Sequence, residues 1–178
     1  MARPDRTAIL GGTFTPIHNG HRALLHHAFQ TASHDGDDDG HVIVGLTAAS
    51  LAKESRSDPS HGRMLGSFEK RRETLDDELD RMSAAYTATY EIIRLEDTRG
   101  PAATREDVDA LVTSPEAKAQ RRAHEINRQR VERRLSPLEI YTPPFIVAED
   151  GKRISSTRIR NGEIDAHGRI LDSTGGNE

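Results

Sequence analysis

Residues 7–32, TAILGGTFTPIHNGHRALLHHAFQTA, contain the pattern that decides the fold. Residues 7–10 form a short apolar run that is typical of a buried strand, and the pair Gly11-Gly12 ends it. Residues 21–32 then place apolar side chains at helical spacing. The order of strand, glycine turn and helix predicts the first half of a βαβ unit.

A second apolar run follows at residues 41–46, after a polar stretch. Val42, Ile43 and Val44 are consecutive apolar residues, without the alternation that a solvent-exposed sheet face would produce. They therefore predict a strand that is buried on both faces, as in a parallel sheet. This strand completes the βαβ unit.

The rest of the chain continues the alternation of strands and helices. Three further strands are predicted at residues 89–95, 110–113 and 138–142. Three further helices are predicted at residues 68–85, 115–135 and 157–161, the first of them capped by Ser67. Residues 53–66 are polar and rich in Ser, Gly and Pro, which predicts a mobile loop long enough to act as a lid.

This alternation predicts an α/β fold. We expect one Rossmann-like, doubly wound parallel sheet of five strands with helices on both faces. In such sheets the ligand lies at the carboxyl ends of the strands, near the switch in strand order, and Gly11 falls at that edge. The expected organisation is one domain over residues 1–171 and a disordered tail at residues 172–178.

The composition of the 178 residues excludes several kinds of site. Because cysteine is absent, disulfides, thiolate metal sites and thiol nucleophiles are excluded. The first residues lack the apolar core of a signal peptide and no apolar stretch reaches membrane-spanning length, so we expect a cytoplasmic protein with no membrane partner. The net charge of -4 argues against general nucleic-acid binding, which needs a basic face.

The first group of residues suited to chemistry lies between the first strand and the first helix. Gly11 lets the backbone approach a phosphate closely, and the helix that starts near Gly20 points free amides and its positive dipole end at an anion. His18 and His21 are three residues apart, so both can face one pocket and donate hydrogen bonds to phosphate oxygens. The alternative interpretation is a glycine turn with two incidental histidines.

A second group, ISSTRIR, occupies residues 154–160. On one interpretation Ser155 or Ser156 simply caps a short helix. Capping and anion binding use the same geometry, however, so a row of hydroxyls and free amides followed by Arg158 also forms a polyphosphate site. Arginine suits this site because its planar fork of donors matches phosphate oxygens.

The pair of motifs HxGH and ISSTR resembles the nucleotidyltransferase superfamily, which activates nucleotides by adenylyl or cytidylyl transfer. Within it the chain is most similar to archaeal-type phosphopantetheine adenylyltransferases, from the first strand to about Leu171. Shorter stretches that support this resemblance are VGLT at residues 44–47, EIN at 125–127, PLEI at 137–140 and AEDG at 148–151. One position departs from the family pattern: Thr15 stands where the family usually has Asp, which weakens any role for a carboxylate there.

The resemblance implies a nucleotidyltransferase that moves AMP from ATP to 4'-phosphopantetheine, giving dephospho-CoA and pyrophosphate in coenzyme A biosynthesis. It implies contacts to the α-phosphate from His18 and His21. It implies contacts to the β- and γ-phosphates from Ser155, Ser156, Thr157 and Arg158. Further contacts to ATP are implied for Gly11, Thr13 and Phe14, with Ser114 and Glu116 on the adenine side.

The resemblance also bears on the acceptor and on the metal. It implies that Thr13 and Lys53 contact the phosphorylated small-molecule acceptor, and a solvated lysine is the alternative interpretation of Lys53. Mg²⁺ is expected to be carried by ATP, because no compact carboxylate cluster in the sequence indicates a metal held by the protein.

Three other functions stay open. The first is a related enzyme that acts on nicotinamide mononucleotide, FMN or an alcohol phosphate, although a chain with 4% aromatic residues offers few stacking surfaces for the two ring systems. The second is a nucleotide-binding module without catalytic activity. The third is nucleic-acid binding by the Arg-rich helix around residues 121–134, where Glu125 and Glu132 interrupt the positive charge.

Overall fold

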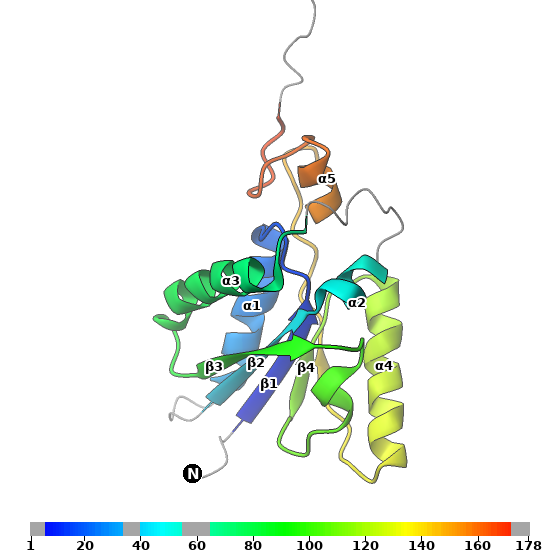
Figure 1. The fold of residues 1–178 in the computed structure, drawn as a ribbon. Coiled ribbons are helices and arrows are strands. Elements are labelled where there is room, and N and C mark those ends of the chain that lie inside the picture. Colours follow the sequence, from blue (N-terminus) through cyan, green and yellow to red (C-terminus); the bar gives the residue numbers. More distant parts are fainter. Residues whose placement is uncertain (1–5, 34–39, 55–64, 172–178) are drawn as a thin grey trace, which may run out of the picture.

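The computed structural model describes residues 6–33, 40–54 and 65–171. The expected tail at residues 172–178 and most of the expected lid lie outside the described residues. Five strands form one sheet: β1 (Arg6–Gly12), β2 (Gly40–Thr47), β3 (Thr89–Leu95), β4 (Ala110–Val112) and β5 (Glu139–Tyr141). Their order is β3-β2-β1-β4-β5 and every pairing is parallel (Figure 1), which confirms the predicted sheet.

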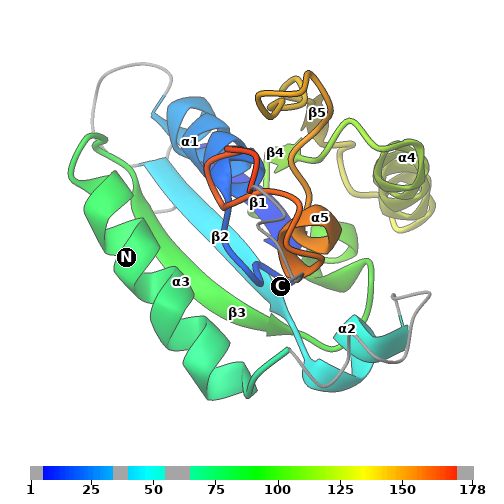
Figure 2. The same ribbon diagram turned by 90° about the horizontal axis from the view of Figure 1, so that it is seen from above.

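Helices cover both faces of the sheet, as predicted (Figure 2). On one face lie α1 (Asn19–Ala32) and α3 (Phe68–Ser83), and on the other lie α4 (Ala117–Glu132) and the short 3-10 helix η2 (Gly100–Ala103). Two short helices, α2 (Ala49–Glu54) and α5 (Ser156–Arg160), lie near the carboxyl ends of the strands (Figure 1). No described helix has the length and apolar character that a membrane span requires.

The side chains of β2 explain why the strands are apolar along their whole length. Val42 and Val44 belong to the core cluster beneath α1 and α3, and Ile43 belongs to the cluster beneath α4. All three side chains are fully buried. Because neighbouring residues of a strand point to opposite faces, both faces of this central strand need apolar residues.

Two segments differ from the expectation. The loop was predicted from residue 53, but residues 53 and 54 belong to α2, which extends from Ala49 to Glu54. Leu51 anchors this helix by burying its side chain, and that tertiary contact outweighs the polar composition of the segment. The second segment is η2, which the sequence did not predict and in which Pro101 occupies an early position. The predicted cap of α3 is confirmed, since Ser67 Oγ accepts a hydrogen bond of 3.1 Å from the Lys70 amide.

The position of β1 determines where a ligand can bind. β1 pairs with β2 on one side and with β4 on the other, and the helices that follow β1 and β4 leave on opposite faces of the sheet. A crevice therefore opens between them at the carboxyl ends of these strands. Gly11 lies at this edge, where an added Cβ would meet Leu95 Cδ1 at 2.8 Å, so a larger residue would displace the Leu95 side chain.

Candidate active site

A cavity of about 800 Å³ lies at the carboxyl ends of the strands. Its walls come from the end of β1, the start of α1, the start of α4 and the segment that leads into α5. The residues of both sequence motifs and of the predicted adenine side that line it are Gly11, Thr13, Phe14, His18, His21, Ser114, Glu116, Ser155, Ser156 and Thr157. The fold thus brings two motifs more than a hundred residues apart to one cavity.

His18 and His21 form a compact pair at the start of α1. His18 is the N-cap residue, and its Nδ1 accepts a hydrogen bond of 3.4 Å from the His21 amide. The two rings stack with their centroids 3.8 Å apart. Because Nδ1 of His18 acts as an acceptor, its Nε2 carries the proton of the neutral ring and can donate to an oxygen.

Burial keeps both imidazoles neutral. It lowers the pKa of His18 to about 4, with smaller contributions from the positive charges of Arg22 and Arg160. It lowers the pKa of His21 to about 3, with a further contribution from His18. At neutral pH the pair therefore offers N–H donors to an anion without being charged beforehand.

This pair predicts a pH-dependent stability. Between about pH 4 and pH 6.5 the unfolded chain binds protons at both histidines while the native protein does not, so the free energy of unfolding falls as the pH is lowered. We expect a loss of the order of 4 kcal/mol between pH 7 and pH 5, about 2 kcal/mol from each histidine. Urea unfolding at several pH values measures it, with the His18→Gln/His21→Gln double variant as the control that shows a smaller loss. Imidazole NMR resonances of either residue titrating near pH 6.5 would contradict the prediction.

Hydrogen bonds dock the C-terminal segment onto the first motif. The Asn19 amide donates to the Ala166 carbonyl at 3.0 Å, and Asn19 Nδ2 donates to the His167 carbonyl at 3.4 Å. Ser155 is the N-cap of α5, where its Oγ accepts from the Arg158 amide. These contacts join the C-terminal segment to the start of α1, and residues of both motifs line one cavity.

The structure differs from the expectation for Arg158. This side chain does not line the cavity, because its guanidinium lies 2.6 Å from Asp150 Oδ2 and 3.0 Å from Glu163 Oε2. Two carboxylates that approach only in the folded chain hold it away from the cavity and raise its pKa. Sequence spacing alone did not reveal these partners.

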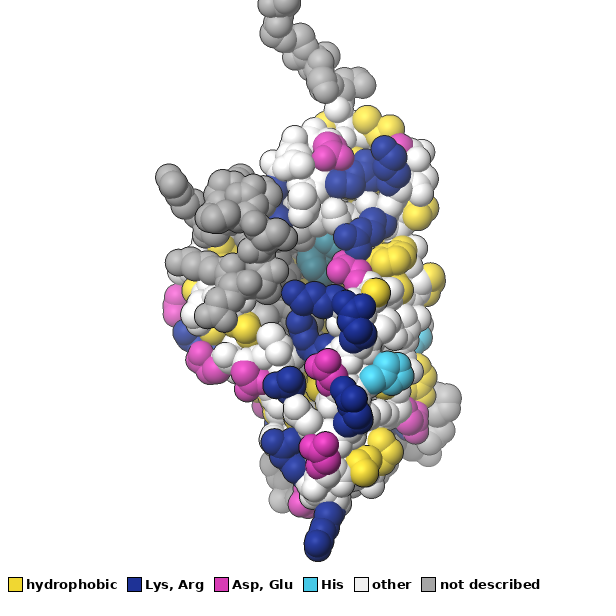
Figure 3. Space-filling view, turned by 90° about the vertical axis from the view of Figure 1, so that its right-hand side faces the viewer, with side chains coloured by type: hydrophobic (Ala, Val, Ile, Leu, Met, Phe, Trp, Pro, Cys, Tyr) yellow, Lys and Arg dark blue, Asp and Glu magenta, His cyan; other side chains and the backbone are white. Residues whose placement is uncertain are grey.

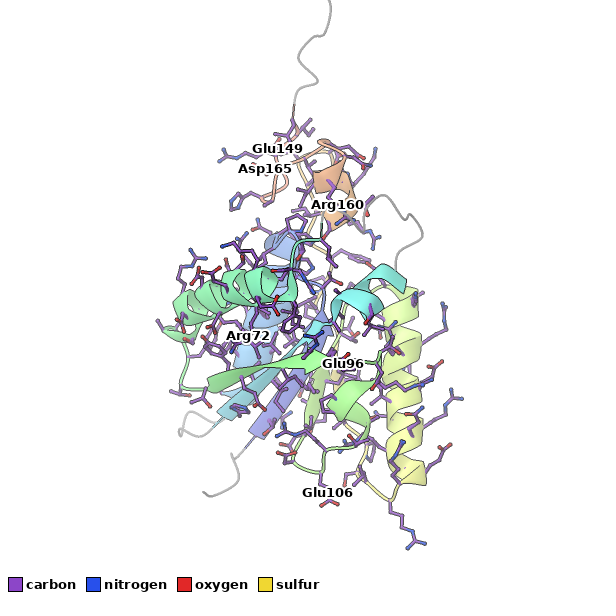
Figure 4. All side chains as sticks on the ribbon, viewed as in Figure 1. Arg72, Glu96, Glu106, Glu149, Arg160 and Asp165 are labelled. Atoms are coloured by element: carbon purple, nitrogen blue, oxygen red, sulfur yellow. The ribbon has the colours of Figure 1, made fainter. Side chains whose placement is uncertain are left out.

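Arg160 lies at the cavity instead (Figure 4). Its Nη1 donates to the Thr15 carbonyl and its Nη2 to Thr157 Oγ1, both at 3.3 Å. Among the described residues no carboxylate lies within ion-pair distance of it, and its buried Nε has no partner. The helical rotation of 100° per residue could have identified Arg160 in the sequence, because Thr157 and Arg160 are three residues apart and share a helix face. Arg158 and Arg160 are two residues apart and point to different faces.

The start of α4 forms another part of the cavity wall. Ser114 and Glu116 line it, and Glu116 Oε1 lies 2.6 Å from Arg153 Nη1, which connects α4 to the C-terminal segment. Gln120 Nε2 donates to the Ser114 carbonyl at 2.7 Å and to Thr142 Oγ1 at 3.1 Å, which ties together the ends of β4 and β5.

The sequence did not single out several cations that line the cavity, namely Arg99, Lys118, Arg122 and Arg153. On the side of the molecule where α4 lies, Lys and Arg side chains gather with single Asp and Glu side chains among them (Figure 3). Lys53 lies at the end of α2, and its side chain lies outside the described residues. Its predicted contact with the acceptor stays a prediction.

The carboxylates of the cavity already have partners. Asp97 Oδ1 accepts from the Arg99 and Gly100 amides at 2.8 and 2.7 Å, and Glu116 pairs with Arg153. In the described ranges no group of three or more His, Asp or Glu side chains is placed to hold a metal ion.

Comparison with known proteins gives matches over most of the chain. The sequence model of the cytidylyltransferase-like family matches residues 9–162. A phosphopantetheine adenylyltransferase of Methanosarcina acetivorans is 40% identical over 161 residues, which is 90% of this chain and 93% of that protein. The phosphopantetheine adenylyltransferase of Methanothermobacter thermautotrophicus is 35% identical over 173 residues, which is 96% of this chain and 93% of that protein.

Solved structures with the same fold have more distant sequences. A protein of unknown function from Archaeoglobus fulgidus superposes with a TM-score of 0.60 at 24% identity, covering 77% of this chain and 88% of that one. The pantothenate synthetase of Thermus thermophilus superposes with a TM-score of 0.52 at 14% identity, covering 89% of this chain and 62% of that one. At these identities the likeness concerns the fold alone.

Proposed function

The chain belongs to the cytidylyltransferase-like family of nucleotidyltransferases, and from this premise we infer that it moves AMP from ATP to 4'-phosphopantetheine, giving dephospho-CoA and pyrophosphate. The observation that carries the choice of acceptor is the 40% identity to a phosphopantetheine adenylyltransferase over 90% of the chain. The meeting of both motifs in one cavity supports the choice of reaction.

In this proposal the triphosphate of ATP lies between α1 and α5. The Nε2–H of His18 faces the α-phosphate, together with His21. The hydroxyls of Ser155, Ser156 and Thr157 bind the β- and γ-phosphates, and Arg160 takes the part first expected of Arg158. Arg160 suits this part because no carboxylate of the described residues neutralises it.

The reaction needs no covalent intermediate on the protein. An oxygen of the acceptor phosphate forms a bond to the α-phosphorus of ATP, and the bond from that phosphorus to the bridging oxygen of pyrophosphate breaks in line. The protein's part is to position both substrates and to stabilise charge on the transferred group. Neutral histidines do this by donating hydrogen bonds that strengthen as the negative charge moves.

The wall of the cavity on the α4 side suits an elongated acceptor. The apolar residues there come from four elements and are Leu51, Leu95, Pro101, Ala102, Ala123 and Ile126. Arg99 and Arg122 also line the cavity and supply positive charge. Lys53 keeps its proposed contact with the acceptor phosphate. Among the described residues, two aromatic rings besides histidine line the cavity, Phe14 and Phe145, which disfavours flavin and nicotinamide acceptors.

Mg²⁺ belongs to this proposal as an ion carried by ATP. The cavity fits this arrangement because the two carboxylates that line it among the described residues, Asp97 and Glu116, already accept hydrogen bonds from protein groups. Bound to the triphosphate, the ion neutralises charge on the leaving pyrophosphate. The substrates proposed here also favour a cytoplasmic location.

The test is pyrophosphate release from ATP with 4'-phosphopantetheine, nicotinamide mononucleotide, FMN and glycerol phosphate offered separately. We expect release with 4'-phosphopantetheine and none above background with the other three. Release with a different acceptor would contradict the proposed substrate. ATP binding with no release for any acceptor would favour the module without catalytic activity.

A further inference from the structure

A buried arginine lies behind the first motif, outside the cavity. Arg71 belongs to α3 and is 4% exposed, and it is not among the residues that line the cavity. Its Nη2 donates to the Thr47 carbonyl at 2.9 Å and its Nη1 to the Thr13 carbonyl at 3.4 Å. Thr13 and Thr47 both line the cavity, so one guanidinium holds two of its walls from behind.

The positive charge of Arg71 lacks an ion-pair partner among the described residues. No carboxylate of the described residues lies within 4.0 Å of its guanidinium, and its buried Nε has no hydrogen-bond partner. Burial lowers its pKa, the charge of Arg94 lowers it further, and the charge of Glu69 offsets part of this shift. A buried and unpaired cation destabilises a fold relative to an apolar residue of the same volume. Stability alone therefore does not explain an arginine here.

The conformation of the first motif explains what the arginine does. Phe14 has a φ of 49°, which is unusual for a residue with a side chain, and its ring packs 5.2 Å from the His21 ring. The Thr13 carbonyl accepts hydrogen bonds from Arg71 Nη1 and from Thr15 Oγ1, the latter at 3.2 Å. Since the C=O and N–H of a trans peptide point in opposite directions, a carbonyl turned towards Arg71 turns the Phe14 N–H towards the cavity.

We propose that Arg71 is a positioning residue for AMP transfer, which holds the Thr13–Phe14 peptide so that the Phe14 amide faces the substrate phosphates. Its unpaired charge lies behind the same surface and favours anions there. No described residue accepts a hydrogen bond from the Phe14 amide, which leaves that donor available. Thr15, the residue that departs from the family pattern, assists by donating to the same carbonyl.

This inference rests on the proposed function, and its test compares Arg71→Met with Arg72→Met. The neighbouring Arg72 is exposed on α3 and is the matched control (Figure 4). We expect Arg71→Met to lower kcat about 10- to 100-fold while its Tm stays at or above that of the wild type, because the change removes an unpaired buried charge. Arg71→Lys keeps the charge but not the planar fork, so its kcat is expected to stay about 10-fold low. Arg72→Met is expected to match the wild type in both measurements.

A second measurement separates this inference from the choice of acceptor. The ¹⁵N–¹H resonance of Phe14 is expected to shift when ATP alone is added to the wild type and to Arg72→Met, and to shift less in Arg71→Met. If the wild type makes no dephospho-CoA but this pattern holds, the acceptor is wrong and the inference on Arg71 stands. Wild-type kcat together with a lowered Tm in Arg71→Met would overturn it, and so would an unchanged shift of Phe14 in that variant.

Discussion

Replacement of His21 by alanine is expected to lower kcat by about 10²- to 10³-fold while the protein stays folded. The imidazole lies in the cavity beside His18, and burial keeps it neutral, so it is a hydrogen-bond donor placed before the reaction starts. Such a donor stabilises charge that grows on the transferred phosphate only in the transition state. Its loss should therefore reduce kcat more than it weakens the binding of ATP.

Steady-state kinetics of pyrophosphate release with 4'-phosphopantetheine measures this effect. His124→Ala is the matched control, since His124 is exposed on α4 and does not line the cavity. The control should keep the kcat of the wild type, and circular dichroism should give the same secondary structure for both variants. A His21→Ala variant with full activity would remove this histidine from the mechanism.

Replacement of Arg160 by alanine is expected to weaken ATP binding about 10- to 100-fold, because the phosphate loses a hydrogen bond from a charged donor. The guanidinium lies at the cavity, bonded to Thr15 and Thr157, without a carboxylate partner among the described residues. Arg158→Ala should change ATP affinity less than about 3-fold and should instead lower the Tm, because Arg158 joins Asp150 to Glu163.

Isothermal titration of ATP into the two variants decides between the two arginines. They are two residues apart on the same short helix, so each controls for the general loss of positive charge from α5. The structure predicts a large effect at Arg160 and a small one at Arg158. The reverse order would mean that Arg158 leaves its carboxylates and turns to the nucleotide when ATP binds.

The local pattern of apolar residues was sufficient to predict the strands of the sheet. The third strand was predicted at residues 89–95, the bounds that the structure has, and the buried run around Ile43 was predicted as a two-faced strand. These predictions succeed because burial on a sheet depends on the period of the apolar residues. The short helix α2 is different: it was not predicted, and its Leu51 is buried by contacts with residues distant in the sequence.

The candidate site also has features that the sequence predicted and features that only the structure shows. The two motifs could be found in the sequence, since a glycine turn before a helix and a row of hydroxyls at a helix start are local features. Which arginine faces the cavity could not be found, because Asp150 and Glu163 compete for Arg158 only after the C-terminal segment has folded back. The proposed role of Arg71 could not be predicted either, since no sequence feature of α3 indicates a contact with Thr13.

The sequence by itself thus predicted the five strands and most of the helices, the edge of the sheet where a ligand is expected, and the motif residues proposed to contact phosphate. Only the tertiary structure decided which charged side chains are free to act there and that His18 and His21 are neutral. The physical reason is that helix and strand formation follow the spacing of residues along the chain. Ion pairing and desolvation follow distances in space, which bring together groups as far apart in sequence as Thr15 and Arg160.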